Sequence, residues 1–345
     1  MPSVGFVFHD AALRHVGGHP DHPERSERID AIRAHLEATG LLARLDHHAP
    51  DPAGRELIEL VHDPSLVTLL EEIDAAGGGR IDLDTGMGPG SLEAAMRGSR
   101  GAVDAAERVL EGVWTAAFVC MRPPGHHATA TRSMGFCLTN HVAVAARWAV
   151  GSGRAERVAV IDWDAHHGNG TQDIFWTDPS VLYVSLHQFP WYPGTGDATE
   201  RGAAEALGTT VNIPLPAGAA EDAYERAFDE VIDPAVHEFE PQLVFVSAGY
   251  DAHMLDPLCM MRLTAGAFYR FAGRVAGYGA GPVCLLEGGY DLDALGWSAG
   301  ATVSALLGDS QPSGVPDDEL NAAQGTPDAL DWVRRAAILR EKTTS

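Results

Sequence analysis

The sequence predicts an α/β fold in which helices cover both faces of a mostly parallel sheet. Three observations lead to this prediction. Short apolar, β-branched runs recur along the chain, stretches with apolar residues at three-to-four spacing separate them, and no linker rich in serine, glycine and proline interrupts the 345 residues. Strands that alternate with helices form parallel βαβ units. We therefore expect a single domain over residues 1–345.

The individual elements follow from the same patterns. Strands are expected where short apolar runs occur, at Val4–Phe8, Thr115–Cys120, Val158–Ile161, Val181–Ser185, Leu243–Ser247 and Val283–Leu286. Helical periodicity predicts helices over Glu24–Leu36, Leu66–Ile73, Leu92–Leu110, His141–Val150, Asp222–Val236 and Thr264–Val275. Residues 309–345 are expected to form a polar connection, Asp309–Gly325, and a last helix, Pro327–Arg340.

Composition excludes some classes of function. The chain has 48 acidic and 24 basic residues and a formal net charge of −24, so we expect no direct binding of nucleic acid. An acidic surface could attract cationic substrates, such as polyamines or basic peptides, or could reflect only solubility or a genomic composition bias. No apolar run approaches the roughly 18 residues of a membrane span. We expect a cytoplasmic protein without membrane contact, and we leave its oligomeric state open, a homo-oligomer included.

The four cysteines are not arranged as a structural framework. They lie far apart in the sequence and form no C-x-x-C pair: Cys120, Cys137, Cys259 and Cys284. This spacing indicates neither a disulfide scaffold nor a zinc finger. We expect buried, reduced thiols.

Turn residues and titratable side chains follow four of the expected strands. The four segments are RPPGHHA at 122–128, DWDAHHGNG at 162–170, AGYDAH at 248–253 and EGGY at 287–290. The carboxyl ends of parallel strands share one edge of a sheet, where α/β proteins place their sites. We therefore expect these four loops to form one site.

Three residues of these loops could hold a metal ion. Asp164 and His166 are two residues apart, and Asp251 would complete the set from a neighbouring strand. Three protein ligands leave a position open for water and substrate, which is typical of a catalytic zinc; such a site could also take ferrous iron. The alternative is that both aspartates cap helices and His166 is a hydrogen-bonded core histidine.

The adjacent His126 and His127 lie on a Pro-Pro-Gly turn and could act as general base and general acid. Asp162 would orient one imidazole strongly, and Asn169 would orient the other more weakly. A second pair, His47-His48, is expected on the surface.

Tyr290 follows two glycines, so its hydroxyl could reach an oxyanion. The alternative is an aromatic ring that packs on a turn.

These motifs resemble the histone deacetylase family, which also includes acetylpolyamine amidohydrolases and acetoin-utilisation proteins. The match consists of RPPGHHA, GFC at 135–137, DWDAHHGNGT at 162–171, SLH at 185–187, YPGTG at 192–196, AGYDAH, DPL at 256–258 and LEGGY at 286–290. The run HPERSERI at 22–29 resembles the family's first active-site loop. The resemblance covers most of the chain and implies a three-layer arginase/deacetylase-like fold.

The resemblance also implies roles for the site residues. Zinc would be held by Asp164, His166 and Asp251, and a potassium ion by Asp162, Asp164, His166, Ser185 and Leu186. His127 would be the general base that later protonates the leaving amine. His126, paired with Asp162, would give electrostatic support, and Tyr290 would bind the oxyanion. His167 is then expected to be structural.

The implied substrate pocket combines two aromatic rings with a polar end. Phe136 and Tyr192, the latter where the family usually has Phe, would flank an acyl-lysine stem, and the Gly135 carbonyl would face the amide. Arg28 is similar to an arginine of the family's acetate-release pocket. Leu258 stands where a polyamine-selective branch carries Glu.

Asn169 and RPPGHHA resemble class II members of the family. Tyr290 is present rather than His, so the weakly active class IIa subtype is not implied.

The leading hypothesis is a zinc-dependent deacetylase of N-acetyl-lysine in proteins or peptides. The alternative is a deacetylase of acetylpolyamines or other small N-acyl amines. A dinuclear manganese hydrolase is less well supported, because Asp251-Ala252-His253 replaces the D-x-D pair it needs. A non-catalytic acetyl-lysine binding protein would be expected to lack Tyr290 or a metal ligand.

Overall fold

The central sheet contains eight strands in the order β2-β1-β5-β10-β9-β6-β7-β8, and every neighbouring pair is parallel. The structure, a computed structural model, describes residues 3–17 and 21–344. The strands of the sheet are β1 (Ser3–Val7), β2 (Asp46–His48), β5 (Trp114–Val119), β6 (Val158–Asp162), β7 (Val181–Gln188), β8 (Thr210–Leu215), β9 (Leu243–Ala248) and β10 (Ala280–Leu286). A small antiparallel pair, β3 (Gly79–Arg80) and β4 (Gly86–Met87), lies outside it.

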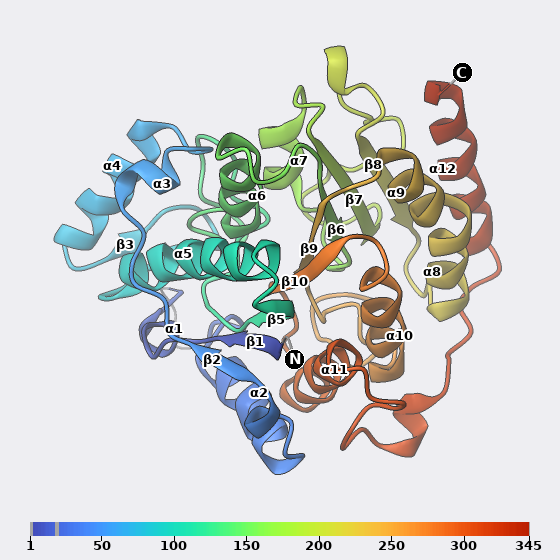
Figure 1. Cartoon of the computed structure of the whole chain (residues 1–345), viewed down its shortest axis with the longest axis horizontal. Helices are drawn as coiled ribbons and strands as arrows, with labels where there is room; N and C mark the ends of the chain where they lie inside the picture. The colour runs from blue at the N-terminus through green and yellow to red at the C-terminus, as the bar shows by residue number, and fades with distance from the viewer. Residues whose placement is uncertain (1–2, 18–20, 345) are drawn as a thin grey trace.

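Helices cover the sheet on both sides (Figure 1), as a parallel sheet requires. Helices α5 and α6 pack together on one side of the strands, whereas α10 and α11 pack together on the other. The helices are α1 (Ala11–Arg14), α2 (Glu27–Ala38), α3 (Arg55–Ile58), α4 (Pro64–Ala75), α5 (Ser91–Leu110), α6 (His141–Gly151), α7 (Asn169–Phe175), α8 (Glu221–Ala227), α9 (Asp233–Phe239), α10 (Ala265–Val275), α11 (Leu292–Leu306) and α12 (Ala329–Thr344). Within residues 3–17 and 21–344, none of the helices combines the length and the hydrophobicity that a membrane span requires.

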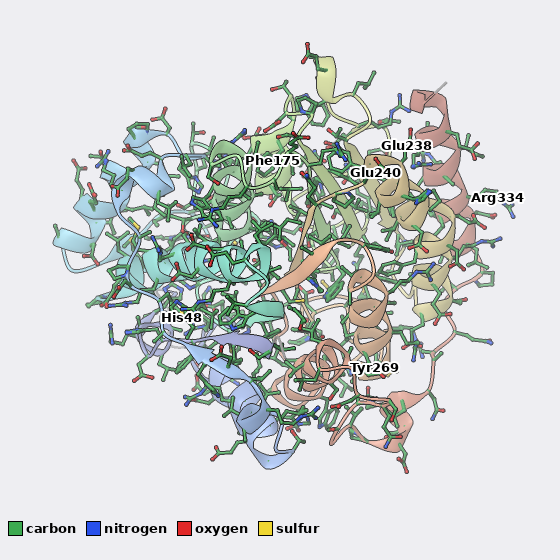
Figure 2. The ribbon with its side chains drawn as sticks, viewed as in Figure 1. His48, Phe175, Glu238, Glu240, Tyr269 and Arg334 are labelled. Atoms are coloured by element: carbon green, nitrogen blue, oxygen red, sulfur yellow. The ribbon has the colours of Figure 1, made fainter. Side chains whose placement is uncertain are left out.

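One hydrophobic core joins side chains from β1 to α12. All residues of β6 and β9 are buried, which explains their continuous apolar runs. Figure 2 shows Glu238 and Arg334 on the outer surfaces of α9 and α12, whereas Phe175 at the end of α7 is buried. Every expected strand and helix corresponds to an observed element, with bounds that differ by a few residues.

The helix expected over Asp222–Val236 contains an interruption. Helix α8 passes through a π-helical turn, Phe228–Ile232, into α9. Pro234 lies in the first turn of α9 and has no backbone N–H to donate to the preceding turn. The wider hydrogen-bond spacing of a π-helical turn accommodates this missing donor.

Two substantial elements were not predicted. Strand β8 contains Asn212 and Pro214, which break its apolar run, and it lies at the sheet edge, where proline is tolerated. Helix α11 contains Gly296 and Gly300, which interrupt a helical pattern. A Cβ at Gly300 would lie 2.4 Å from the His35 ring of α2, so close packing of the two helices requires a glycine there.

The C-terminal segment is attached to the rest of the chain by buried polar contacts. The polar connection includes a 3₁₀ turn, Asp317–Leu320. Its Glu319 lies 2.8 Å from His253 and accepts the backbone N–H of Ala265. Helix α12 then packs on β8 and α8.

Candidate active site

The site lies beyond the carboxyl ends of β5, β6, β9 and β10, which are neighbours in the central part of the sheet. Asp162 ends β6, and Asp164 and His166 follow it. Asp251 follows β9, and the tandem histidines follow β5. The strand order therefore brings together the loops that the sequence places after four separate strands.

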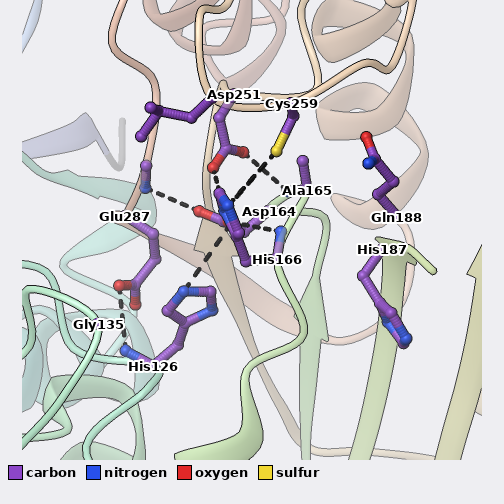
Figure 3. A network of polar contacts seen from close by, with 12 residues as sticks. His126, Gly135, Asp164, Ala165, His166, His187, Gln188, Asp251, Cys259 and Glu287 are labelled. Atoms are coloured by element: carbon purple, nitrogen blue, oxygen red, sulfur yellow. Dashed lines mark hydrogen bonds and ion pairs between the residues drawn. The ribbon is translucent and has the colours of Figure 1, made fainter. Parts of the chain in front are cut away.

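Three possible ligand atoms lie close together in a candidate metal site. Nδ1 of His166 is 2.8 Å from Oδ2 of Asp251 and 3.2 Å from Oδ1 of Asp164, and Figure 3 shows the three side chains turned toward one another. Two ligands bound about 2.0–2.2 Å from a tetrahedral zinc lie roughly 3.3–3.6 Å apart. The separations are slightly shorter, and the carboxylate and imidazole donors suit zinc or ferrous iron, so these residues fit the expected ion.

Backbone groups orient the two carboxylates. Asp164 Oδ2 accepts the N–H of Gly288, and Asp251 Oδ1 accepts the N–H of Ala165. A Cβ at Gly249 would lie 2.1 Å from Asp164, and one at Gly288 would lie 2.4 Å from Asp251. Glycine is therefore required at both positions for the two loops to approach the carboxylates.

The helix-cap alternative for the aspartates is wrong. Gly168 is the N-cap of α7, and Thr264 is the N-cap of α10, the next helix after Asp251. Both aspartates instead face His166 from neighbouring strand ends.

A cysteine also lies beside the metal site. His166, Asp251 and Cys259 form a group whose ligand atoms all lie within 4.8 Å of one another. Cys259 Sγ is 3.5 Å from Nε2 of His166 (Figure 3). All four cysteines are free and buried, as expected, but the proximity of Cys259 to His166 had no sequence signal.

The tandem histidines have different partners. Nδ1 of His126 lies 3.1 Å from the Asp162 carboxylate, whereas Nδ1 of His127 lies 2.8 Å from the amide oxygen of Asn169. Burial disfavours the charged form of His126, but the charges of Asp162, Asp164 and Glu287 outweigh burial and raise its pKa to about 10. Burial, together with the positive charge of His126, lowers the pKa of His127 well below its usual value.

The expected pocket residues line one cavity of about 230 Å³. Gly135, Phe136, Tyr192, Leu258 and Tyr290 surround it together with His126, His127 and His166. The Tyr192 ring is perpendicular to His127 at 5.2 Å between centroids, and the Phe136 ring is perpendicular to Tyr290 at 5.9 Å. Two aromatic walls therefore lead to the imidazoles and to the phenol.

Arg28 lies beneath Tyr290. Its guanidinium is 5.0 Å from the centre of the Tyr290 ring and donates to the carbonyls of Gly289 and Glu287. The expected acetate-pocket arginine thus also supports the loop that carries the phenol. Asp256 accepts the Tyr290 N–H from the other side.

The residues expected to hold potassium lie on two adjacent strands and the loop after one of them. Asp162 of β6 is paired with Ser185 of β7, next to Leu186. His167 bonds through both ring nitrogens to Thr195 and Gln172, which suits a structural role. Of the second pair, His47 is exposed, whereas His48 is half-buried and bonds Asp104.

Several polar residues around the site had not been assigned roles from the sequence. Buried Glu24 lies between the guanidinium groups of Arg28 and Arg122. The Tyr183 hydroxyl donates to Asp162, and Asp84 lines the cavity. Glu24 and Arg122 stand in the motifs HPERSERI and RPPGHHA, but a motif does not show which of its residues form ion pairs. Tyr183 and Asp84 carry no spacing signal, so only the fold could reveal them.

Comparison with known proteins agrees with this geometry. Residues 22–306 match the Histone deacetylase domain family. This chain belongs to the histone deacetylase family. Its resemblance to that family, first drawn from the motifs, is thereby confirmed.

Individual members of the histone deacetylase family align over most of the chain. A "Probable deacetylase" of Archaeoglobus fulgidus is 39% identical over 88% of this chain and 86% of its own length. A "Histone deacetylase-like amidohydrolase" of Pseudomonas aeruginosa is 38% identical over 84% of this chain and 76% of its own length. The crystal structure of the HDA15 HD domain covers 99% of this chain and 95% of that chain, with a TM-score of 0.91 and 32% identity.

Membership of the histone deacetylase family accounts for fold and reaction class together. The eight-stranded parallel sheet flanked by helices is the predicted fold class. The chain is a metal-dependent amidohydrolase of this family, which acts on amide bonds.

Proposed function

We propose that this chain is a zinc-dependent deacetylase that hydrolyses Nε-acetyl-lysine side chains in proteins or peptides. The observation that carries this proposal is the 230 Å³ cavity, which joins two aromatic walls to the His126-His127 pair, Tyr290 and His166. An acetyl-lysine side chain is a long apolar stem that ends in an amide. The cavity presents apolar walls to such a stem and polar groups to its amide.

Zinc, or ferrous iron, would be held by Asp164, His166 and Asp251. When bound there, it would polarise the acyl carbonyl and the attacking water. A potassium ion would be held beside it by oxygen atoms of Asp162, Asp164, His166, Ser185 and Leu186, and would support the loop that follows β6.

The tandem histidines divide the proton transfers. His127, neutral because burial lowers its pKa, takes the proton of the attacking water at Nε2. The same nitrogen then gives a proton to the leaving lysine amine. His126 stays positively charged beside Asp162 and stabilises the negative charge that develops on the acyl oxygen.

Tyr290 and the pocket walls act on the substrate directly. The Tyr290 hydroxyl donates a hydrogen bond to the developing oxyanion. Phe136 and Tyr192 hold the lysine stem between them, and the Gly135 carbonyl accepts the amide N–H. Arg28 supports the Tyr290 loop and offers positive charge to the acetate product.

A second candidate function is the hydrolysis of acetylpolyamines. It is favoured by Asp84, an acidic residue that lines the same cavity, and by the net charge of −24. Leu258 opposes it, because an apolar side chain lines the cavity where a polyamine-selective branch carries Glu.

Measurement of kcat/KM in parallel for acetyl-lysine peptides, acetylspermidine and acetylputrescine tests the proposal. We expect the peptides to be preferred. A preference for a polyamine of more than tenfold would replace the first function by the second, and hydrolysis of none of the three would contradict both.

A further inference from the structure

A buried glutamate lies behind the tandem histidines, and no proton transfer or substrate contact of the mechanism above involves it. Glu287 is the first residue after β10 and is completely buried. Its Oε2 accepts the backbone N–H of Gly125 at 2.7 Å and that of His126 at 3.1 Å, and Figure 3 shows the carboxylate beside the His126 backbone. It therefore joins the loop after β10 to the turn after β5.

We propose that Glu287 is a positioning residue whose carboxylate holds the Gly125-His126 backbone, and with it the two histidines, against the metal ligands. The kinetic part of this inference rests on the proposed deacetylase function. The structural part, in which one carboxylate fixes two N–H groups, is independent of the proposed function.

The contacts of the carboxylate point to this specific task. Among the described residues, its second oxygen, Oε1, has no hydrogen-bond partner. The two N–H groups of the turn are therefore the polar contacts that hold the side chain. A buried carboxylate is costly unless its hydrogen bonds compensate, and burial raises the pKa of Glu287 to about 7. The hydrogen bonds that compensate for the burial of this carboxylate come from the N–H groups of Gly125 and His126.

The backbone of Glu287 is fixed independently of the carboxylate. Its N–H donates to the carbonyl of Ala248 in β9, and its carbonyl accepts from Arg28. The next residue, Gly288, donates to Asp164. The carboxylate is thus held at a constant distance from the metal ligands, so a turn that is bonded to it has a defined position relative to them.

The position of the imidazoles depends on the same turn. The two rings lie 4.0 Å apart, and the carbonyl of His126 accepts the N–H groups of Gly170 and Thr171 at the start of α7. Glu287 holds the turn from one side and α7 holds it from the other. Loss of one support would let His127 shift relative to the metal site without a change in its own partners.

The test compares two substitutions of similar size. Glu287→Gln keeps an oxygen that can accept both N–H groups, whereas Glu287→Met removes the acceptor. Glu221→Met is the matched control, because Glu221, the first residue of α8, is also buried and accepts two backbone N–H groups, from Thr264 at the start of α10 and from Ala323 in the connection before α12. Each variant is examined as the full-length, zinc-loaded protein by hydrogen–deuterium exchange and by steady-state kinetics.

We expect E287M to exchange the amides of residues 125–126 at least tenfold faster than the wild type. Its kcat should fall at least tenfold with KM changed less than twofold. E287Q should stay within threefold of the wild type in exchange and kcat, and E221M should leave exchange at 125–126 unchanged. If E287M does not fold, Glu287→Asp, whose shorter side chain withdraws the acceptor, takes its place.

The inference would be overturned if the amides of residues 125–126 exchanged in E287M as slowly as they do in the wild type. It would also be overturned if E287Q were as impaired as E287M, because the acceptor would then not be the important property. If the wild type hydrolyses no acetyl-lysine substrate, the proposed function fails while the exchange comparison still decides the role of Glu287.

Discussion

Nδ1 of His127 lies 2.8 Å from Oδ1 of Asn169. An amide oxygen only accepts hydrogen bonds, so Nδ1 carries the proton and Nε2 of the neutral imidazole is free to act as a base. The neighbouring His126 instead faces the carboxylate of Asp162. One acceptor is neutral and the other is charged, and this difference assigns the two imidazoles different protonation states.

Replacement of Asn169, the neutral acceptor, should move the pH profile of kcat/KM. Asn169→Asp places a carboxylate beside His127, which raises the pKa of the imidazole because the negative charge favours its charged form. Activity requires the neutral imidazole, so the acid limb of kcat/KM should move to higher pH. Asn169→Leu adds no charge and should lower kcat without this shift. A profile of N169D between pH 5 and 9 that coincides with the wild type would contradict the assignment of His127 as the base.

The hydroxyl group of Tyr290 can be removed without loss of the aromatic ring. Tyr290→Phe keeps the contacts with Phe136 and Arg28 but removes the donor to the oxyanion. We expect kcat to fall by the equivalent of about 2–4 kcal/mol. Tyr269→Phe, a change in α10 away from the cavity, is the control and should leave kcat unchanged. Equal turnover of Y290F and wild type in single-turnover assays would remove Tyr290 from the mechanism.

Leu258 should set the preference between neutral and cationic substrates. Leu258→Glu adds a negative charge to the cavity wall, so the ratio of kcat/KM for acetylspermidine to that for an acetyl-lysine peptide should rise at least tenfold. Leu258→Met keeps the wall apolar and should leave the ratio within about twofold. If L258E and L258M gave the same ratio, position 258 would not set the preference between neutral and cationic substrates.

The lowered pKa values of two buried histidines, which lie away from the metal ligands, predict that the fold loses stability at acid pH. Burial lowers the pKa of His62 and that of His141 to about 4. His62 Nε2 accepts the N–H of Asn140, so the folded state requires its neutral form.

The unfolded state, with a histidine pKa near 6.5, binds more protons below that pH. The free energy of unfolding should therefore decrease as pH falls from about 6.5 to 4. Urea denaturation across this range measures the decrease. His62→Gln should weaken this dependence, and a slope that is the same in H62Q and wild type would show that His62 does not contribute.

Much of the fold could be predicted because its central strands are buried on both faces. Val158–Ile161 and Leu243–Ser247 are continuous apolar runs for this reason. Strand β8 was missed because an edge strand tolerates Pro214. Helix α11 was missed because contact with His35 of α2 requires Gly300, and a packing requirement between helices far apart in the sequence leaves only an isolated glycine.

Part of the site could be predicted from the sequence, and part of it could not. The placement of the histidine pair, of Asp164 and of Asp251 could be anticipated, because each follows a strand and strand ends converge. Glu287 stood in a recognised motif, yet its bonds to Gly125 and His126 cross from β10 to β5. Cys259 contacts His166 through a loop whose path has no periodic pattern. Contacts of this kind depend on tertiary structure, which spacing along the chain does not describe.

The central claim is that one metal ion, held by Asp164, His166 and Asp251, supports amide hydrolysis. The most direct test strips the protein of metal with a chelator and titrates it with zinc while deacetylation of an acetyl-lysine peptide is measured. We predict no activity in the stripped protein and a linear recovery that ends at one equivalent of zinc, with no recovery in Asp251→Ala. Activity that survives complete metal removal, or that needs two equivalents of manganese, would contradict the account.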